Sequence, residues 1–146
     1  MTTRTRETDG QVLAATRAMY DAYGDRPSFD AHLHPDVTIW ESDQPGGLIG
    51  LAELDALRDA RSPAADAPRP MLSVLEPVVD RWDDRVAVIR YLLRAEVAGT
   101  VTEFRVTDVL EGSGPAGPGT QWRIVHHHAE HLAAPAGGTP ALGDGA

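Results

Sequence analysis

The densest group of side chains that could do chemistry lies in residues 121–131, QWRIVHHHAEH. Alternate side chains of a β-strand point to opposite faces, so this stretch divides into two sets. One set consists of Trp122, Ile124, His126, His128 and Glu130. The other set consists of Arg123, Val125, His127, Ala129 and His131. Both sets end in ionisable groups that follow apolar ones, which suits the wall of a ligand cavity.

The three adjacent histidines suit proton transfer, because an imidazole titrates near neutral pH. We expect His128 or His126 to act as a general acid or base in a cleft, and His127 to contact a ligand. The run lies inside a patterned strand and is therefore not an expression tag. A structural role stays open, in which the imidazoles bond to neighbouring strands or line a dimer face, since clustered ionisable groups mark function only statistically.

A metal site is a third interpretation of the histidines. His126, His128 and Glu130 share one face, and zinc or iron would need three such ligands and an open position. Copper or nickel could use fewer imidazoles. His32 and His34 also exist, but nothing elsewhere obviously completes the set. We predict no metal and no other cofactor.

Length and composition exclude several classes of protein. The chain has 146 residues, 42% of them hydrophobic and 24% charged, which predicts one domain with a real core. A net charge of −9 argues against a nucleic-acid or anionic-membrane surface, and the absence of cysteine excludes disulfides and thiolate chemistry. No apolar run approaches the roughly 20 residues that span a bilayer, and no secretory signal is evident. We therefore expect a cytoplasmic protein.

The apolar residues recur at helical spacing in the first part of the chain. They predict helices at residues 10–23, 28–34 and 51–61. Gly24 should end the first helix, Ser28 should cap the second, and Pro35 should stop it. Residues 1–9 are polar, and we expect them to be flexible.

Alternating apolar residues predict strands in the rest of the chain. The predicted strands are residues 37–41, 72–80, 85–97, 100–111 and 121–131. The alternation is clearest in 85–97, whose apolar face includes Tyr91 and Leu93. Both would line an internal hollow, although core packing is the simpler role for Tyr91. The order of elements indicates an α+β fold, a curved sheet wrapped over helices, within one domain at 10–132. The tail at 133–146 is rich in Pro, Gly and Ala and is expected to be disordered.

Glu41 follows Trp40 at the end of the first predicted strand. A carboxylate beside an indole can have its pKa raised by desolvation and then serve as a base. The alternative is a solvated carboxylate at the start of a loop. Trp40 could stack on a flat ligand if it faces the hollow, although packing is its simpler role.

Three stretches carry a family resemblance: LHPDVTIWESDQPGGLIG, VLEPVVDRWDDRVAVIRYLL and RVTDVLEGSG followed by QWRIVHHHAEH. In that order they resemble the nuclear-transport-factor-2-like superfamily. The nearest groups look like the SnoaL-like polyketide cyclases and the association (hub) domain of calcium/calmodulin-dependent protein kinase II. The resemblance covers roughly residues 10–131 and implies a cone-shaped, curved antiparallel sheet over three helices, with a homodimer as the family habit. It does not imply one function, because this fold hosts enzymes and binding modules alike.

The resemblance carries over unevenly to single residues. Glu41 falls near the position where related ketosteroid isomerases hold a general-base aspartate. The tyrosine that donates an oxyanion hydrogen bond in those enzymes has no obvious match, since its region reads Arg17-Ala18-Met19. Tyr20 and Tyr23 are nearby but on other helical faces.

The hub domain carries pocket arginines that this chain lacks. The corresponding positions look like Leu93, Thr107 and Ala129, so the resemblance does not reproduce an anion-binding cluster. Arg105 could supply one substitute positive charge.

Residues 100–111 allow two orientations. The hydrophobic pattern alone would bury Phe104, Val106 and Leu110, and Asp108 with them, as an anomalous buried acid. The resemblance instead points Arg105 and Thr107 toward the pocket. We prefer the second orientation; in the first, Asp108 becomes the better catalytic acid.

These observations favour a small cofactor-independent enzyme that isomerises, cyclises or dehydrates an apolar carbonyl-bearing metabolite, polyketide- or steroid-like by resemblance. Glu41 would move a proton, His128 with His126 would be its partner, and Arg105 would stabilise oxyanion charge. The expected ligand contacts are Trp40, Tyr91, Leu93, Thr107 and His127. The alternatives are a non-catalytic ligand-binding or oligomerisation module and a metal-dependent lyase or oxygenase. We expect a homodimer that binds neither nucleic acid nor membranes.

Overall fold

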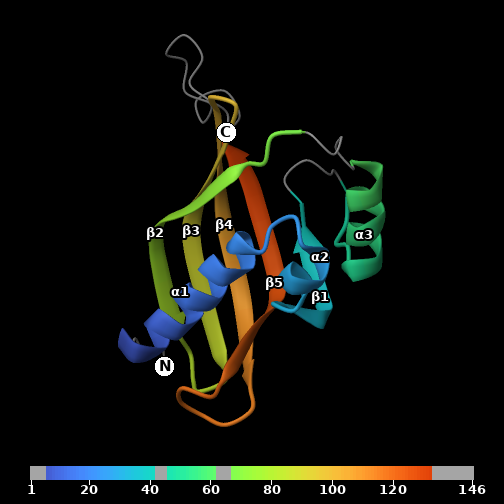
Figure 1. Cartoon of the computed structure of the whole chain (residues 1–146). Coiled ribbons are helices and arrows are strands. Elements are labelled where there is room, and N and C mark those ends of the chain that lie inside the picture. The colour runs from blue at the N-terminus through green and yellow to red at the C-terminus, as the bar shows by residue number, and fades with distance from the viewer. Residues whose placement is uncertain (1–5, 42–45, 62–66, 133–146) are drawn as a thin grey trace.

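Three helices and five strands make up the computed structural model, which describes residues 6–41, 46–61 and 67–132. Their order is α1 (Arg6–Asp21), α2 (Arg26–Asp30), β1 (Leu33–Trp40), α3 (Leu51–Ala60), β2 (Met71–Arg81), β3 (Val86–Val97), β4 (Thr100–Ser113) and β5 (Gln121–Leu132). The strands form one sheet in the order β1-β5-β4-β3-β2, and α1 crosses one of its faces (Figure 1). This confirms the predicted α+β class and the curved sheet over three helices. The sheet is mixed, because β1 runs parallel to β5 while the other pairs are antiparallel.

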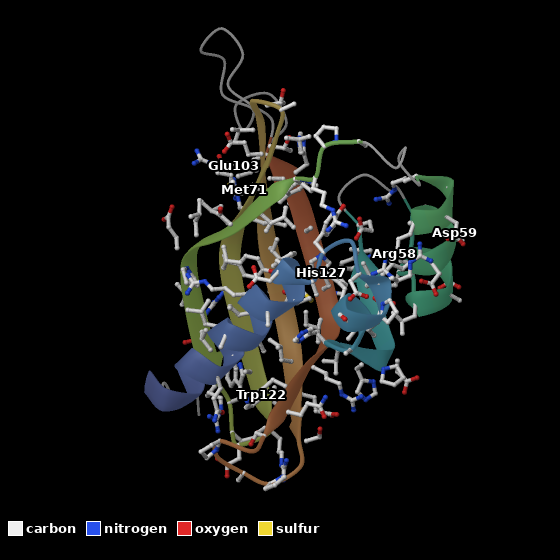
Figure 2. All side chains as sticks on the ribbon, in the orientation of Figure 1. Arg58, Asp59, Met71, Glu103, Trp122 and His127 are labelled. Carbon is white, nitrogen blue, oxygen red and sulfur yellow. The ribbon has the colours of Figure 1, made fainter. Side chains whose placement is uncertain are left out.

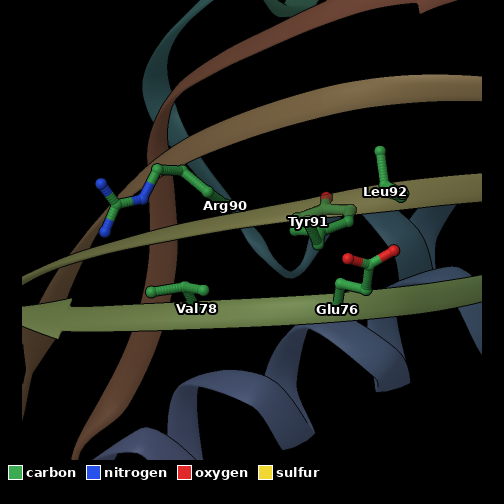
Figure 3. A pocket seen from close by; sticks show the side chains of 5 residues that line it. All are labelled: Glu76, Val78, Arg90, Tyr91 and Leu92. Carbon is green, nitrogen blue, oxygen red and sulfur yellow. The ribbon is translucent and has the colours of Figure 1, made fainter.

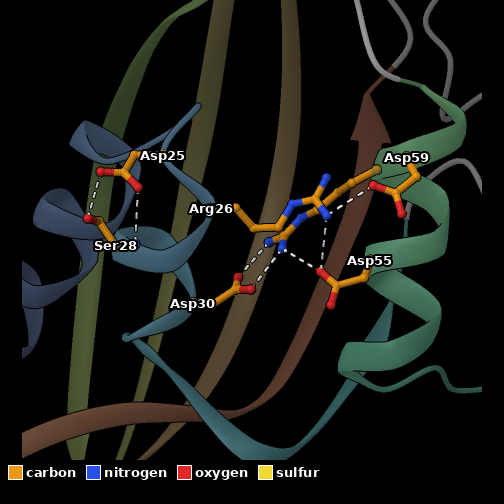
Figure 4. A network of polar contacts seen from close by, with 7 residues as sticks. Asp25, Arg26, Ser28, Asp30, Asp55 and Asp59 are labelled. Atoms are coloured by element: carbon orange, nitrogen blue, oxygen red, sulfur yellow. Dashed lines mark hydrogen bonds and ion pairs between the residues drawn. The ribbon is translucent and has the colours of Figure 1, made fainter.

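The ends of several elements differ from the prediction. Helix α1 begins at Arg6, inside the segment expected to be flexible, and Gly24 follows its end at φ +97°. Asp25, not Ser28, caps α2: its carboxylate accepts from the Ser28 backbone N–H at 3.4 Å and from the Ser28 hydroxyl at 2.7 Å (Figure 4). Pro35 lies within β1 and does not stop a helix, which an edge strand tolerates. The predicted disordered tail lies outside the described residues.

The core lies between α1 and the face of the sheet that α1 covers, which we call the helix face. Val12 and Met19 of α1 and Ile89 of β3 are at most 1% exposed. Burying side chains of this size stabilises the fold by about 1.5–3 kcal/mol each. Thr16 on the same stripe of α1 satisfies its buried hydroxyl by donating to the Val12 carbonyl at 3.0 Å. None of the described helices is both long and apolar enough to cross a membrane.

Ion pairs join α2 to α3. The Arg58 guanidinium on α3 donates to both carboxylate oxygens of Asp30 on α2, at 2.8 and 2.9 Å. Arg26 on α2 donates to Asp59 on α3 at 3.1 Å. Two parallel hydrogen bonds to one carboxylate fix both direction and distance. The network therefore holds α3 in place beside β1.

A β-bulge in β5 decides which histidines face the helices. His126 pairs with Val109 of β4, but the next pair along is Ile124 with Leu110, so Val125 is an extra residue. The extra residue shifts the alternation of side chains by one position. Ile124 therefore shares the helix face with His127, and His126 turns to the opposite side, which we call the outer face.

Candidate functional site

Four side chains form a continuous hydrogen-bonded chain on the helix face. The Tyr20 and Tyr91 hydroxyl oxygens are 2.6 Å apart, and the Tyr91 hydroxyl donates to Asp108 Oδ2 at 2.8 Å. His127 Nδ1 lies 2.5 Å from the second oxygen, Oδ1, of the same carboxylate. Asp108 is completely buried, and the two tyrosines are at most 9% exposed. The chain therefore joins α1, β3, β4 and β5 around one buried carboxylate.

Strand register brings these groups together. Asp108 of β4 pairs directly with His127 of β5 and, on its other side, with Ile89 of β3. Directly opposed residues have Cβ atoms about 5 Å apart, close enough for a carboxylate to meet an imidazole. Tyr91 follows two residues after Ile89 on the same face, and Tyr20 reaches it from the buried stripe of α1. Figure 2 labels His127 near the end of α1 that carries Tyr20.

The hydrogen bonds have one consistent direction, because an ionised carboxylate can only accept. Tyr91 uses its single proton on Asp108, so Tyr20 is the donor to Tyr91. His127 donates its Nδ1 proton to Asp108, which leaves Nε2 as the reactive ring nitrogen. Among the described residues Nε2 has no hydrogen-bond partner, and the His127 side chain is 17% exposed. A ligand that reaches Nε2 would therefore meet an imidazole whose orientation is already fixed.

Burial and the charge of Asp108 together set the protonation states of the hydrogen-bonded side chains. Burial alone would lower the pKa of His127, but the charge and hydrogen bond of Asp108, with a smaller effect of Glu41, raise its pKa above the ordinary value. Burial, and then the Asp108 charge, raise the pKa of both Tyr20 and Tyr91. The two tyrosines therefore stay neutral, and His127 keeps its proton to higher pH than a free imidazole.

Glu41 lies on the same face as this chain. It follows β1, and strand alternation places it on the side of Val37 and Ile39, both 2% exposed. Its charge contributes to the raised pKa values of Tyr20 and His127, and its side chain is 21% exposed. We call Glu41 together with Tyr20, Tyr91, Asp108 and His127 the helix-face cluster.

His126 and His128 lie on the outer face, so the structure does not bring them together with Glu41 as its predicted acid–base partners. Both rings contact Trp40 edge-on, at centroid distances of 5.7 and 5.5 Å. His126 Nδ1 lies 2.8 Å from the Thr38 hydroxyl. Trp40 is 44% exposed and also faces outward, away from the helix-face cluster. The bulge at Val125 is the reason, since unbroken alternation would have kept His126 beside Ile124.

The preferred orientation of β4 is also wrong. Arg105 lies on the outer face, where its guanidinium is 3.8 Å from Glu130, and Thr107 pairs there with His128. The hydrophobic pattern identified the correct orientation, with Asp108 buried. Two donors, from Tyr91 and His127, meet the cost of burying that carboxylate.

Other predicted residues lie where the strand pattern placed them. Tyr91 and Leu93 are on the helix face, and Leu93 packs against the core. Tyr20 was not predicted as a site residue, because it was assigned to a different helical face from the matching position. The spacing of Val12, Thr16 and Tyr20 at intervals of four could have identified it, since such residues share one helical stripe. Within the described ranges, no group of three or more histidine and acidic side chains is placed to hold a metal ion.

An open groove of about 450 Å³ lies between β2 and β3. Glu76 and Val78 of β2 and Arg90, Tyr91 and Leu92 of β3 line it (Figure 3). It forms where β2 loses its regular register between Leu75 and Val78, and Glu76 has φ +53° there. The groove does not include Glu41 or His127, so it is separate from the reactive end of the helix-face cluster.

Comparison with solved structures identifies the fold. The S. rosetta CaMKII hub is 25% identical with a TM-score of 0.70, over 89% of this chain and 99% of that chain. An NTF2-like protein of unknown function from Pseudomonas putida is 16% identical with a TM-score of 0.70, over 88% of this chain and 89% of that chain. The chain has the nuclear-transport-factor-2-like fold. This confirms the resemblance to that superfamily.

A second kind of neighbour shares the fold. A ketosteroid isomerase-like protein from Erwinia carotovora atroseptica is 16% identical with a TM-score of 0.63, over 89% of this chain and 100% of that chain. No protein-family model matches the sequence, and neither does any curated protein. Enzyme-like and hub-like proteins therefore share this fold, and the fold alone does not decide between the two functions.

Proposed function

We propose that the chain is a cofactor-independent acid–base enzyme that isomerises, cyclises or dehydrates an apolar carbonyl-bearing metabolite. The observation that carries this proposal is the fully buried Asp108, which accepts from His127 Nδ1 on the face that also holds Glu41. A carboxylate that orients an imidazole and stabilises its protonated form is a recurring arrangement for proton transfer. The structural neighbour described as ketosteroid isomerase-like supports the same reaction class.

The proposed roles of Glu41, His127 and Asp108 follow from the protonation state and the solvent exposure of each side chain. Glu41, partly exposed, would take a proton from the carbon next to the carbonyl, so that the C–H electron pair forms the enol double bond. His127 Nε2–H would give a hydrogen bond or a proton to the carbonyl oxygen as negative charge develops there. Asp108 would stabilise the imidazolium throughout and would not itself exchange a proton with the substrate. Return of the proton from Glu41 to another carbon completes isomerisation. In dehydration, Glu41 would give that proton to a hydroxyl group on the β-carbon, which leaves as water as the enol electrons form the new C=C bond.

Exchange of carbon-bound hydrogen tests this proposal without knowledge of the natural substrate. β-Tetralone, a neutral fused-ring ketone with acidic C–H bonds, would be incubated with the protein in deuterated water, and NMR would follow loss of the α-proton signal. We expect catalysed exchange that falls by about 100-fold or more in Glu41→Gln and in His127→Gln, because a positioned acid or base contributes about 10²–10⁴-fold.

His128→Gln is the matched control, since His128 is the neighbouring imidazole on the outer face. Exchange by this variant should equal that of the wild type. Equal exchange rates in wild type, Glu41→Gln and His127→Gln would contradict the proposed roles.

Self-association through the outer face is a second candidate function. The side-chain pairs Arg94–Glu103, at 3.5 Å, and Arg105–Glu130, at 3.8 Å, balance charge across this face, although the chain carries −9 overall. Large apolar side chains stay exposed beside them, including Trp40 at 44%. The neighbour described as a CaMKII hub fits such a role.

Sedimentation velocity tests this second candidate. We expect a homodimer at micromolar concentration, and a monomer for Trp40→Arg, which would place an unpaired charge in the interface. Tyr23→Arg, at a residue that is 51% exposed on α1's side of the molecule, is the control and should stay dimeric. A wild-type protein that sediments only as a monomer would contradict the dimer.

A further inference from the structure

We propose that the helix-face cluster selects a neutral ligand that accepts a hydrogen bond, and that it rejects carboxylate ligands. This inference deepens the proposed function, because it names the charge class of ligand for the same site. It rests on two features of the cluster. Carboxylates outnumber positive charges, and most of the hydrogen-bond donors already bond to other members of the cluster.

Negative charge dominates the cluster. Asp108 is 0% exposed, so solvent screens its charge poorly, and Glu41 is within electrostatic reach of both Tyr20 and His127. His127 supplies one positive charge when it is protonated. Arg61, at the end of α3, lies 3.9 Å from Glu41, but its side chain is 47% exposed and its charge is therefore better screened. The carboxylate of a ligand would be the third at this site, beside those of Asp108 and Glu41.

The hydrogen-bond donors of the cluster are already committed. Tyr20 donates to Tyr91, Tyr91 donates to Asp108, and His127 Nδ1 donates to Asp108. No tyrosine hydroxyl proton is left to bind an anion. Within the cluster, the single donor that can face a ligand is His127 Nε2–H, which matches one carbonyl oxygen.

Glu41 and the imidazolium of His127 narrow the class of ligand further. Glu41 can only accept, so it suits a C–H acid or a hydroxyl group next to the carbonyl. An ammonium ligand would be attracted by Glu41 and Asp108, but it has no acceptor for His127 Nε2–H and would meet the imidazolium charge directly. A neutral carbonyl compound is the one class that satisfies both His127 and Glu41.

Three probes that share one ring system test this inference: β-tetralone, the carboxylate with the same ring and attachment position, and the corresponding amine. NMR of the histidine ring nitrogens at pH 6 would follow His127, with His128 on the outer face as an internal reference. We expect saturable shifts of the His127 signals with β-tetralone, and binding of the carboxylate and of the ammonium weaker by about tenfold or more.

Charge-neutralising variants sharpen the test. Glu41→Gln should narrow the preference for ketone over carboxylate by about tenfold, and Asp108→Asn should do the same if it folds. Glu130→Gln, on the outer face, should leave the preference unchanged. Carboxylate or ammonium binding as tight as ketone binding, or no His127 shift with β-tetralone, would overturn the inference.

The two proposals fail in different ways. Selective ketone binding without hydrogen exchange would contradict the enzymatic proposal alone. Hydrogen exchange together with equally tight carboxylate binding would contradict the charge selection alone.

Discussion

Two faces of the same strand show how environment decides the role of a residue. His127 and His128 are adjacent in β5, yet the first meets a buried carboxylate and the second meets an exposed tryptophan. The identity of the residue is the same in both positions, and only the direction of the side chain differs. On the helix face, low solvent access strengthens each electrostatic contact, whereas on the outer face water screens them.

The same contrast holds between acidic groups. Asp108 is 0% exposed and accepts from two side chains, while Glu130 on the next strand is 58% exposed and lies 3.8 Å from Arg105. A buried charge with defined partners is strongly coupled to its surroundings, and a surface ion pair contributes about 0–1 kcal/mol. Loss of the Asp108 carboxylate on the helix face should therefore cost more stability than loss of the Glu130 carboxylate on the outer face.

Removal of the buried carboxylate should give the largest effect. Asp108→Ala leaves the Tyr91 hydroxyl and His127 Nδ1 without their acceptor, and we expect the free energy of unfolding to fall by about 3 kcal/mol. Urea denaturation measures the change. Glu130→Ala is the control on the outer face and should change the free energy of unfolding by less than about 0.5 kcal/mol. If both variants lowered the free energy of unfolding equally, the proposed difference between the helix face and the outer face would be wrong.

Removal of one hydroxyl group from the hydrogen-bonded series should lower the free energy of unfolding by an intermediate amount. Tyr91→Phe deletes a donor to Asp108 and an acceptor for Tyr20, and we expect a loss of about 1–2 kcal/mol in the free energy of unfolding. Tyr23→Phe, on an exposed tyrosine of the same type, should be nearly neutral. A double-mutant cycle of Tyr20→Phe with Tyr91→Phe should show coupling of about 1 kcal/mol, and strict additivity would show that the two hydroxyl groups act independently.

The pH dependence of stability should give the smallest effect. The pKa of His127 is raised in the folded state, so protonation of this residue stabilises the fold. That contribution is fully present below the unfolded-state pKa of about 6.5, and it is lost as pH rises through the higher folded-state pKa. Urea denaturation from pH 5.5 to 8.5 should show this decline in the wild type and a smaller one in His127→Gln. The same decline in both proteins would assign it to other groups.

Much of the fold could be predicted from the sequence, because the spacing of apolar residues indicates which side chains are buried. The alternation of Phe104, Val106 and Leu110 identified the helix face of β4 and placed Asp108 there. The resemblance led away from that orientation, because it mapped pocket positions onto Arg105 and Thr107.

The face of the histidines could not be predicted in the same way. A single extra residue, Val125, shifts the alternation, and nothing in the side-chain pattern of β5 marks its position. The part played by Tyr20 depends on contact with Tyr91, which is 71 positions away in sequence. Such contacts depend on tertiary packing, and local periodicity does not report them.

The most direct test of this account is a ring-nitrogen NMR titration of His127. Asp108 should hold His127 with the proton on Nδ1 and should raise its pKa above about 6.5, and Asp108→Asn should lower that pKa, because burial then acts without the opposing charge. A His127 that titrates at or below the ordinary value, unchanged by Asp108→Asn, would contradict the claim that a buried carboxylate organises this site.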